Sequence, residues 1–201
     1  MTTDTECGTC VVRWQPSDAI NPLLKSGVCL KVLFVCTGNI CRSPTAERLA
    51  TAYSVRSGIP DFHASSAGTR AVIGHPIHHD AALVIERLGG DTSHFVARQL
   101  TPRIASDADL VLTMTTAQRD TVLELAPHKL HRTFTLTEAA RLASDCNAQT
   151  VADLAVLRPL LAAHERADVP DPIGQGAETY ERVGSWIADL LPPVVGLCRR
   201  G

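Results

Sequence analysis

The sequence predicts an α/β protein: one domain built on an open, twisted parallel sheet with helices on both faces. The chain has 201 residues, 45% of them hydrophobic and 20% charged, which is typical of one globular domain. Short apolar segments alternate with helical patterns, and residues 29–35 are β-branched and apolar on both faces, as in a central strand covered from both sides. In such a sheet the ligand crevice lies at the carboxyl ends of the strands.

The first half of the chain predicts two strands and two helices. Ser43 and Pro44 predict the start of a helix, with Ser43 as the capping hydroxyl and the proline at the first helical position. Residues 62–66 predict a second strand, and residues 80–88 predict a helix that Gly89 and Gly90 end.

The second half continues the alternation. Its expected elements are a buried strand at 109–114, a helix at 118–125, a last strand at 131–135, two helices on either side of the polar stretch 144–150, a loop at 169–176, and a final helix over about 178–191 that ends before Pro192 and Pro193. Residues 1–28 lack periodicity and are expected to be an N-terminal extension, followed by a folded domain at 29–195 and a tail at 196–201.

Charge and cysteine content exclude several classes of protein. With 19 basic and 21 acidic residues the formal charge is −2, so we expect no nucleic-acid partner. No apolar run is long enough to span a bilayer, and no basic start precedes an apolar block, so we expect a cytoplasmic protein with no membrane association. Seven cysteines, an odd number, indicate reactive thiols in a reducing compartment rather than a disulfide scaffold.

No metal or other cofactor is expected. Cys7 and Cys10 lack a second Cys/His pair at the spacing of a zinc finger. His75, His78 and His79 are better explained as a solvated helix entrance than as metal ligands.

The loop after the first strand carries the strongest chemical signal. Cys36 and Arg42 form a Cys-x5-Arg loop, whose inward N–H groups and following helix N-terminus would cradle a tetrahedral dianion such as phosphate. Arg42 can add a planar pair of donors, and the same positive field favours the nucleophilic thiolate of Cys36. Gly38 and Asn39 tolerate the positive φ of a tight loop, and Ser43 can donate its hydroxyl to the sulfur.

Phosphoester hydrolysis also needs an acid for the leaving group and a base for water. Asp171 is the best candidate for both roles, because Pro170 and Pro172 restrict its direction and a loop at the sheet edge can reach the cradle.

Residues 32–49 (VLFVCTGNICRSPTAERL) closely resemble the opening of the low-molecular-weight protein tyrosine phosphatases. The likeness continues through residues 66–69, 97–101 and 109–114 and through Asp171-Pro172 with the helix that contains Tyr180. It implies a four-stranded parallel sheet and metal-free hydrolysis of a tyrosine-phosphorylated protein through a cysteinyl phosphate. It also implies that Cys36 is the nucleophile, Arg42 the phosphate binder and Asp171 the general acid. The implied substrate-binding loop comprises Thr37, Gly38, Asn39, Ile40, Cys41 and Ser43. Cys41 matches the family's second loop thiol, which can form a disulfide with the nucleophile.

Some positions depart from the family. The aromatic residues that often wall the slot for the phosphorylated ring are replaced by residues 71–73 and 173–174, which lack aromatics. An aliphatic slot lacks the stacking of an aromatic wall, which is worth roughly 0.5–1.5 kcal/mol, so we expect weaker discrimination for a phosphorylated ring than in relatives with that wall. Thr115 stands where the family often has Asp, and residues 137–168 are long for the family.

Three alternatives remain open at this point, together with the oligomeric state. An arsenate reductase of the same fold would need a cysteine relay, but no cysteine lies between Cys41 and Cys146. A phosphatase for phosphoarginine or a small phosphoester shares the loop, although Ile40 stands where arginine phosphatases tend to have Thr. An inactive phosphoprotein-binding module is disfavoured by the intact set of Cys36, Arg42 and Asp171.

Overall fold

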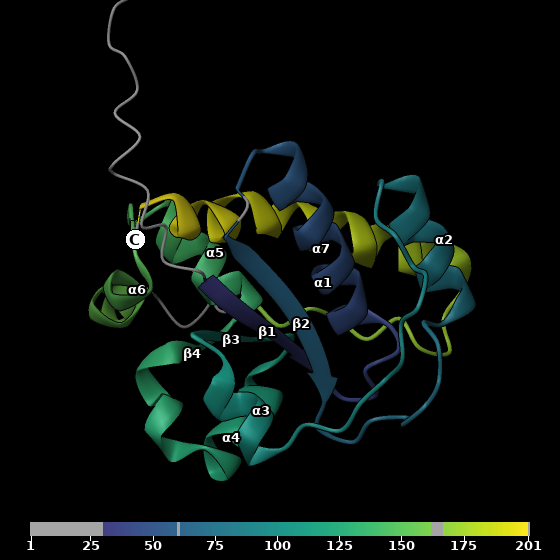
Figure 1. Ribbon diagram of the computed structural model, residues 1–201, viewed down its shortest axis with the longest axis horizontal. Coiled ribbons are helices and arrows are strands. Elements are labelled where there is room, and N and C mark those ends of the chain that lie inside the picture. The colour runs from purple at the N-terminus through teal and green to yellow at the C-terminus, as the bar shows by residue number, and fades with distance from the viewer. Residues whose placement is uncertain (1–29, 60, 162–166, 201) are drawn as a thin grey trace, which may run out of the picture.

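A four-stranded parallel sheet with the order β2-β1-β3-β4 forms the centre of the computed structural model, which describes residues 30–59, 61–161 and 167–200 (Figure 1). Its strands are β1 (Leu30–Cys36), β2 (Phe62–Gly68), β3 (Leu110–Thr113) and β4 (Thr133–Thr135). The predicted α/β fold with an open parallel sheet is confirmed.

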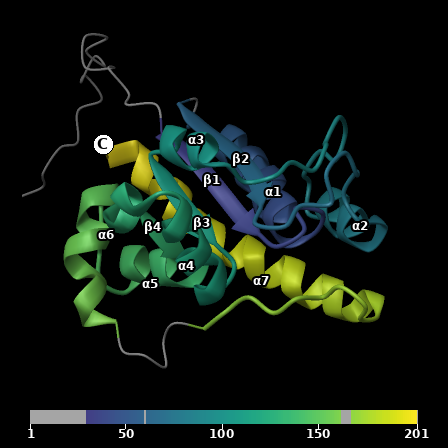
Figure 2. The same cartoon turned by 90° about the horizontal axis from the view of Figure 1, so that it is seen from below.

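Helices cover both faces of the sheet (Figures 1 and 2). They are α1 (Arg42–Arg56), α2 (His79–Arg87), α3 (Pro102–Asp107), α4 (Thr116–Leu125), α5 (Leu136–Ser144), α6 (Val151–Leu157) and α7 (Ala177–Gly196), with 3-10 turns at Pro127–Arg132, Arg158–Leu160 and Leu197–Arg200. Because side chains alternate along a strand, Val32 and Phe34 join the core with α1, α5 and α7, whereas Leu33 and Val35 join the smaller core with α3 and α4. The double-sided burial explains why β1 is apolar at nearly every position.

The order of the strands places a crevice at the carboxyl end of β1. The chain passes from β1 to β2 on one side and then returns to β3 on the other. Ligands bind at such a point of reversal in open α/β sheets. Cys36 ends β1 and Arg42 begins α1, so the Cys-x5-Arg loop lies in this crevice.

The final helix is longer than predicted. The expectation that it ends before Pro192 and Pro193 is wrong, because α7 continues to Gly196 with both prolines inside it. Each proline removes one backbone hydrogen bond, but both lie on the half-buried side of the helix, where solvent can reach the freed carbonyls. Leu191, Val194 and Val195 are buried in the main core, and this burial continues the helix past the prolines.

Smaller differences concern element boundaries. Ser43 is not the cap of α1, because Cys41 occupies the N-cap position and the Ser43 hydroxyl bonds within the loop. Helix α3 was missed, although Thr101 caps it and Pro102 is its first residue. The last strand starts at Thr133 rather than at 131, because a 3-10 turn occupies the preceding residues.

The two helices expected between residues 136 and 161 are present as α5 and α6. The extension at 1–28, with Cys7 and Cys10, lies outside the described residues, and α7 runs through the expected boundary at 195. The proposed domain limits stay predictions. No helix in the described part of the chain is both long and apolar enough to cross a bilayer.

Candidate active site

Hydrogen bonds to its backbone carbonyl groups fix the conformation of the loop from Cys36 to Arg42. The carbonyl oxygens of Cys36, Thr37 and Gly38 accept from the N–H groups of Thr69, Arg70 and Val72, each at 2.9 Å. The Ile40 carbonyl accepts from His78 N at 2.7 Å, and the Cys41 carbonyl accepts from Thr45 N at 3.0 Å. Since the N–H of a trans peptide points opposite to its carbonyl, the bonded carbonyls turn the loop's N–H groups toward its interior. Such a ring of N–H groups ahead of a helix N-terminus is an anion-binding concavity.

Cys36 presents its sulfur to hydrogen-bond donors, although the residue is only 2% exposed. The Ser43 hydroxyl lies 3.0 Å from Cys36 Sγ, and Asn39 N donates to the same sulfur at 3.3 Å. Both contacts favour a negatively charged sulfur.

A buried network fixes the direction of the Ser43 hydroxyl. Asn39 has a φ of 55° and is fully buried, and its Nδ2 donates to Ser43 Oγ at 3.0 Å and to Ser66 Oγ at 2.8 Å. Because Ser43 Oγ accepts from Asn39, its own hydrogen is available for Cys36 Sγ. Ser66 in turn donates to Glu47 Oε2 at 2.6 Å, and burial raises the pKa of Glu47 above 4.5, partly offset by that hydrogen bond.

Arg42 joins the loop to the segment that carries Asp171. Its guanidinium donates from Nη2 to Asp171 Oδ2 at 2.5 Å and from Nη1 to the Val169 carbonyl at 3.1 Å. Arg42 is 4% exposed, and its Nε has no hydrogen-bond partner within the described ranges. A buried, unsatisfied N–H at the base of a cradle is suited to an oxyanion.

Asp171 is oriented but accessible. Its other carboxylate oxygen accepts from Ile173 N at 3.2 Å, and its side chain is 48% exposed. Val169 N donates to the Met114 carbonyl at 2.8 Å, which fastens the segment to the end of β3. The structure therefore brings together the three predicted residues Cys36, Arg42 and Asp171 at one pocket.

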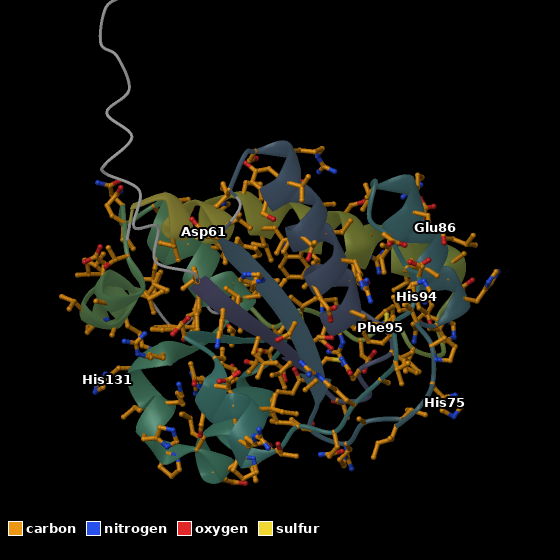
Figure 3. The ribbon with its side chains drawn as sticks, viewed as in Figure 1. Asp61, His75, Glu86, His94, Phe95 and His131 are labelled. Carbon is orange, nitrogen blue, oxygen red and sulfur yellow. The ribbon has the colours of Figure 1, made fainter. Side chains whose placement is uncertain are left out.

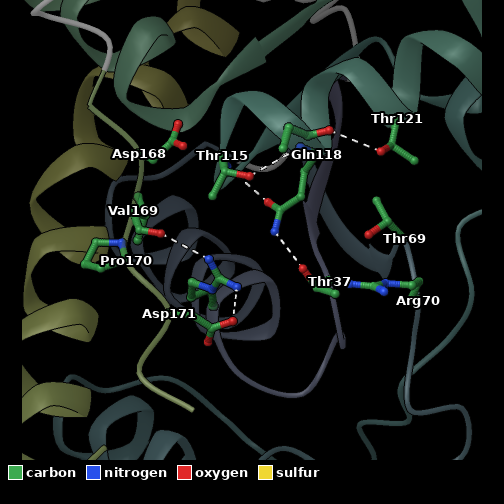
Figure 4. Close-up of a pocket in the computed structure, with 12 residues that line it drawn as sticks. Thr37, Thr69, Arg70, Thr115, Gln118, Thr121, Asp168, Val169, Pro170 and Asp171 are labelled. Carbon is green, nitrogen blue, oxygen red and sulfur yellow. Dashed lines mark hydrogen bonds and ion pairs between the residues drawn. The ribbon is translucent and has the colours of Figure 1, made fainter. Parts of the chain in front are cut away.

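Gln118 is a supporting residue that the sequence analysis missed. Its Nε2 donates to Thr37 Oγ1 at 3.0 Å (Figure 4). Its Oε1 accepts from the N–H groups of Met114 and Thr115 at 3.1 and 3.0 Å. Thr115 caps α4 by accepting from Gln118 N at 3.2 Å. Thr and Asp are both good N-caps, so this departure from the family keeps the start of the helix.

The pocket that Cys36, Arg42 and Asp171 line, the candidate catalytic pocket, has a volume of about 440 Å³ and aliphatic walls. Val72 and Ile173 line it from the two segments where the family often has aromatic residues, in agreement with the sequence, and Ile40 adds a third aliphatic side chain. A second, adjoining pocket of about 470 Å³ opens between the Asp171 segment and α4 and shares Thr37, Arg42, Arg70 and Asp171 with the first (Figure 4).

Cys41 is the second cysteine of the loop, and its side chain is buried. Burial, and then the neighbouring Cys36, raise the pKa of the Cys41 thiol well above its usual range, so Cys41 is a neutral thiol. Cys146 and Cys198 line neither pocket, and Cys198 lines a separate pocket with Leu30, the first residue of β1.

The histidine cluster lies at a helix entrance, as predicted. His79 opens α2, and His78 stacks on Tyr180 with ring centroids 4.9 Å apart. His75 lies on the loop ahead of α2, on the same side of the molecule as His94 (Figure 3). Over the residues described, no group of three or more His, Cys, Asp or Glu side chains is arranged to hold a metal ion.

Comparison with known proteins decides the family. Residues 31–153 match the family model described as low molecular weight phosphotyrosine protein phosphatase. The chain belongs to this family. The low molecular weight protein-tyrosine-phosphatase Ptp of Acinetobacter johnsonii is 36% identical over 105 residues, which are 52% of this chain and 70% of the relative.

Solved structures of low molecular weight phosphatases share the fold. The low molecular weight protein tyrosine phosphatase from T. tengcongensis has a TM-score of 0.67 at 30% identity, covering 83% of this chain and 97% of that chain. The YwlE arginine phosphatase from Geobacillus stearothermophilus has a TM-score of 0.65 at 27% identity, covering 83% and 90%. The predicted family and its four-stranded fold are confirmed, and the chain is an enzyme of this class. The family match ends before Asp171, so the assignment of that residue depends on the site geometry.

Proposed function

We propose that the protein hydrolyses phosphotyrosine in protein substrates through a cysteinyl phosphate on Cys36. The observation that carries the proposal is the convergence at one pocket of Cys36, hydrogen-bonded by Ser43 and Asn39, with the Arg42–Asp171 pair. A nucleophile, an anion binder and an acid in one cleft are the minimum set for this chemistry.

In the first step the phosphate dianion occupies the ring of N–H groups and takes donors of Arg42, including the unpaired Nε. The dianion competes with Asp171 for Arg42 and frees that carboxyl group for the leaving oxygen. Once released from Arg42, the Asp171 carboxylate takes up a proton from solvent. The thiolate of Cys36 attacks phosphorus, the bond between phosphorus and the tyrosyl oxygen breaks, and Asp171 gives this proton to that oxygen.

In the second step Asp171, now a carboxylate, takes a proton from water as the water oxygen attacks phosphorus. The phosphorus–sulfur bond breaks, and inorganic phosphate and the thiolate are regenerated. The Ser43 hydroxyl at 3.0 Å donates to the sulfur as its charge returns, which assists its departure. No metal or other cofactor takes part in either step.

The aliphatic walls of the catalytic pocket can bury the apolar surface of a phosphorylated ring, but they cannot stack on it. Ile40, Val72 and Ile173 offer apolar surface of the right kind, at a loss of roughly 0.5–1.5 kcal/mol relative to an aromatic wall. Phosphoarginine is the second candidate substrate, supported by the likeness to an arginine phosphatase.

We further propose a cytoplasmic location, because a thiolate nucleophile needs a reducing compartment. Phosphoproteins are the proposed partners, and nucleic acid is not among them, in line with the formal charge of −2.

A substrate panel on the purified enzyme tests the proposal. We expect phosphotyrosine peptides to be turned over with a higher kcat/KM than matched phosphoserine and phosphoarginine peptides, and Cys36→Ser to abolish turnover while circular dichroism shows an intact fold. Turnover by Cys36→Ser at the wild-type rate would refute the nucleophile, and a preference for phosphoarginine would refute the substrate.

A further inference from the structure

Arg70 lines both the catalytic pocket and the adjoining pocket. No acidic side chain of the described chain forms an ion pair with its guanidinium. Its backbone is firmly held, because Arg70 N donates to the Thr37 carbonyl at 2.9 Å and the next residue, Ala71, donates to Gln99 Oε1 at 3.0 Å. A Cβ on Gly68 would lie 2.5 Å from the Thr37 carbonyl, so the end of β2 packs directly on the catalytic loop. Contacts with the loop therefore fix the backbone of Arg70, and its guanidinium forms no ion pair within the described chain.

The other charged groups at the adjoining pocket have partners. Arg42 and Asp171 form an ion pair, and Asp168 Oδ1 accepts from Thr116 N at 2.8 Å and from Thr116 Oγ1 at 3.1 Å. In Figure 4 the Arg70 side chain extends toward Thr37, on the opposite side of the pocket from Asp168. Arg70 and Asp168 are therefore the two charged groups of this pocket without an ion pair in the described chain, and they lie on opposite sides of it. A substrate carboxylate can contact Arg70 while staying apart from Asp168.

We propose that the adjoining pocket is a specificity subsite in which Arg70 binds an acidic side chain of the substrate protein, two residues from the phosphotyrosine. This inference rests on the proposed function. Side chains two positions apart on an extended peptide lie on the same face, about 7 Å from each other. Because the two pockets share a wall, one strand of substrate can place its phosphotyrosine in the first pocket and the neighbouring acidic side chain in the second.

The test compares kcat/KM for three phosphotyrosine peptides that carry Glu two residues before the phosphotyrosine, Glu two residues after it, or Gln at both places. We expect one Glu peptide to be preferred over the Gln peptide by roughly two- to fivefold in the wild type at low salt, as for a partly exposed ion pair. Arg70→Gln should reduce this ratio to about one, and Arg70→Glu should favour a peptide with Lys at the same place.

Arg56→Gln is the matched control, since it removes the same charge at the far end of α1, about 20 Å along the helix from the catalytic loop. It should keep the wild-type ratio. The proposal is overturned if the wild type shows no acidic preference, or if Arg70→Gln slows all three peptides by the same factor. Turnover of the Gln peptide alone reports the proposed phosphatase function, so the two hypotheses fail independently.

Discussion

Removing the Ser43 hydroxyl tests the network that prepares the sulfur. The hydroxyl lies 3.0 Å from Cys36 Sγ, and Asn39 Nδ2 at 3.0 Å occupies its acceptor side. Ser43→Ala therefore removes a hydrogen bond to a charged atom, worth about 1.5–3 kcal/mol. At about 1.4 kcal/mol per tenfold change in rate, kcat should fall by about 10- to 150-fold.

Stopped-flow kinetics with p-nitrophenyl phosphate should show where the loss occurs. The sulfur must leave phosphorus in the second step, so the variant should release a burst of p-nitrophenol equal to the enzyme concentration before a slow steady state. Ser54→Ala is the control, because Ser54 is a buried serine of the same helix whose hydroxyl donates to the Thr51 carbonyl at 2.9 Å. A loss in Ser43→Ala below about threefold, or no larger than in the control, would refute the reasoning.

Three further predictions concern the acid, a buried carboxyl group and oxidation. Asp171→Asn should lower kcat by about 10²–10⁴-fold on a phosphotyrosine peptide and far less for the first step with p-nitrophenyl phosphate, whose leaving group needs no proton; equal losses would remove the acid role. Burial raises the pKa of Glu47 in the folded protein above 4.5, so its contribution to stability is complete below about pH 4.5 and is lost as the pH rises through the raised value. The free energy of unfolding in urea should therefore fall with pH relative to that of Glu47→Gln, and a constant difference between the two proteins would contradict this. Peroxide should oxidise Cys36 to a sulfenic acid, which Cys41 then attacks to form a disulfide and release water. In Cys41→Ser a second equivalent of peroxide should oxidise the Cys36 sulfenic acid to the sulfinic acid, which thiols do not reduce. After excess peroxide, dithiothreitol should therefore restore activity in the wild type but not in Cys41→Ser, and mass spectrometry that finds both thiols free in inactivated enzyme would exclude the disulfide.

The catalytic loop could be predicted from the sequence because its parts are contiguous. Cys36, Arg42 and the intervening residues lie within one short segment between a strand and a helix, so their spacing alone indicates an anion cradle. Asp171 could be proposed because two prolines make its segment a loop, but its bond to Arg42 spans 129 positions and became visible only in the fold.

The supporting network could not be predicted in the same way. Gln118 reaches Thr37 across 81 positions, and Asn39 reaches Ser66 across 27, because separate strands end at the same edge of the sheet. For Ser43 the local pattern predicts both a helix cap and a donor to the sulfur, and only the contact with Cys36 Sγ is present in the fold. Local propensity predicts that the last helix ends before Pro192, but the burial of neighbouring apolar residues stabilises the helix beyond it.

The most direct measurement is acid quenching of the wild-type enzyme during turnover of a phosphotyrosine peptide, followed by peptide mass spectrometry. The account predicts one phosphoryl group on the peptide that contains Cys36, attached to that sulfur and absent in Cys36→Ser. Turnover with no phosphoryl group on Cys36 at any quench time, or with the group on another residue, would contradict it.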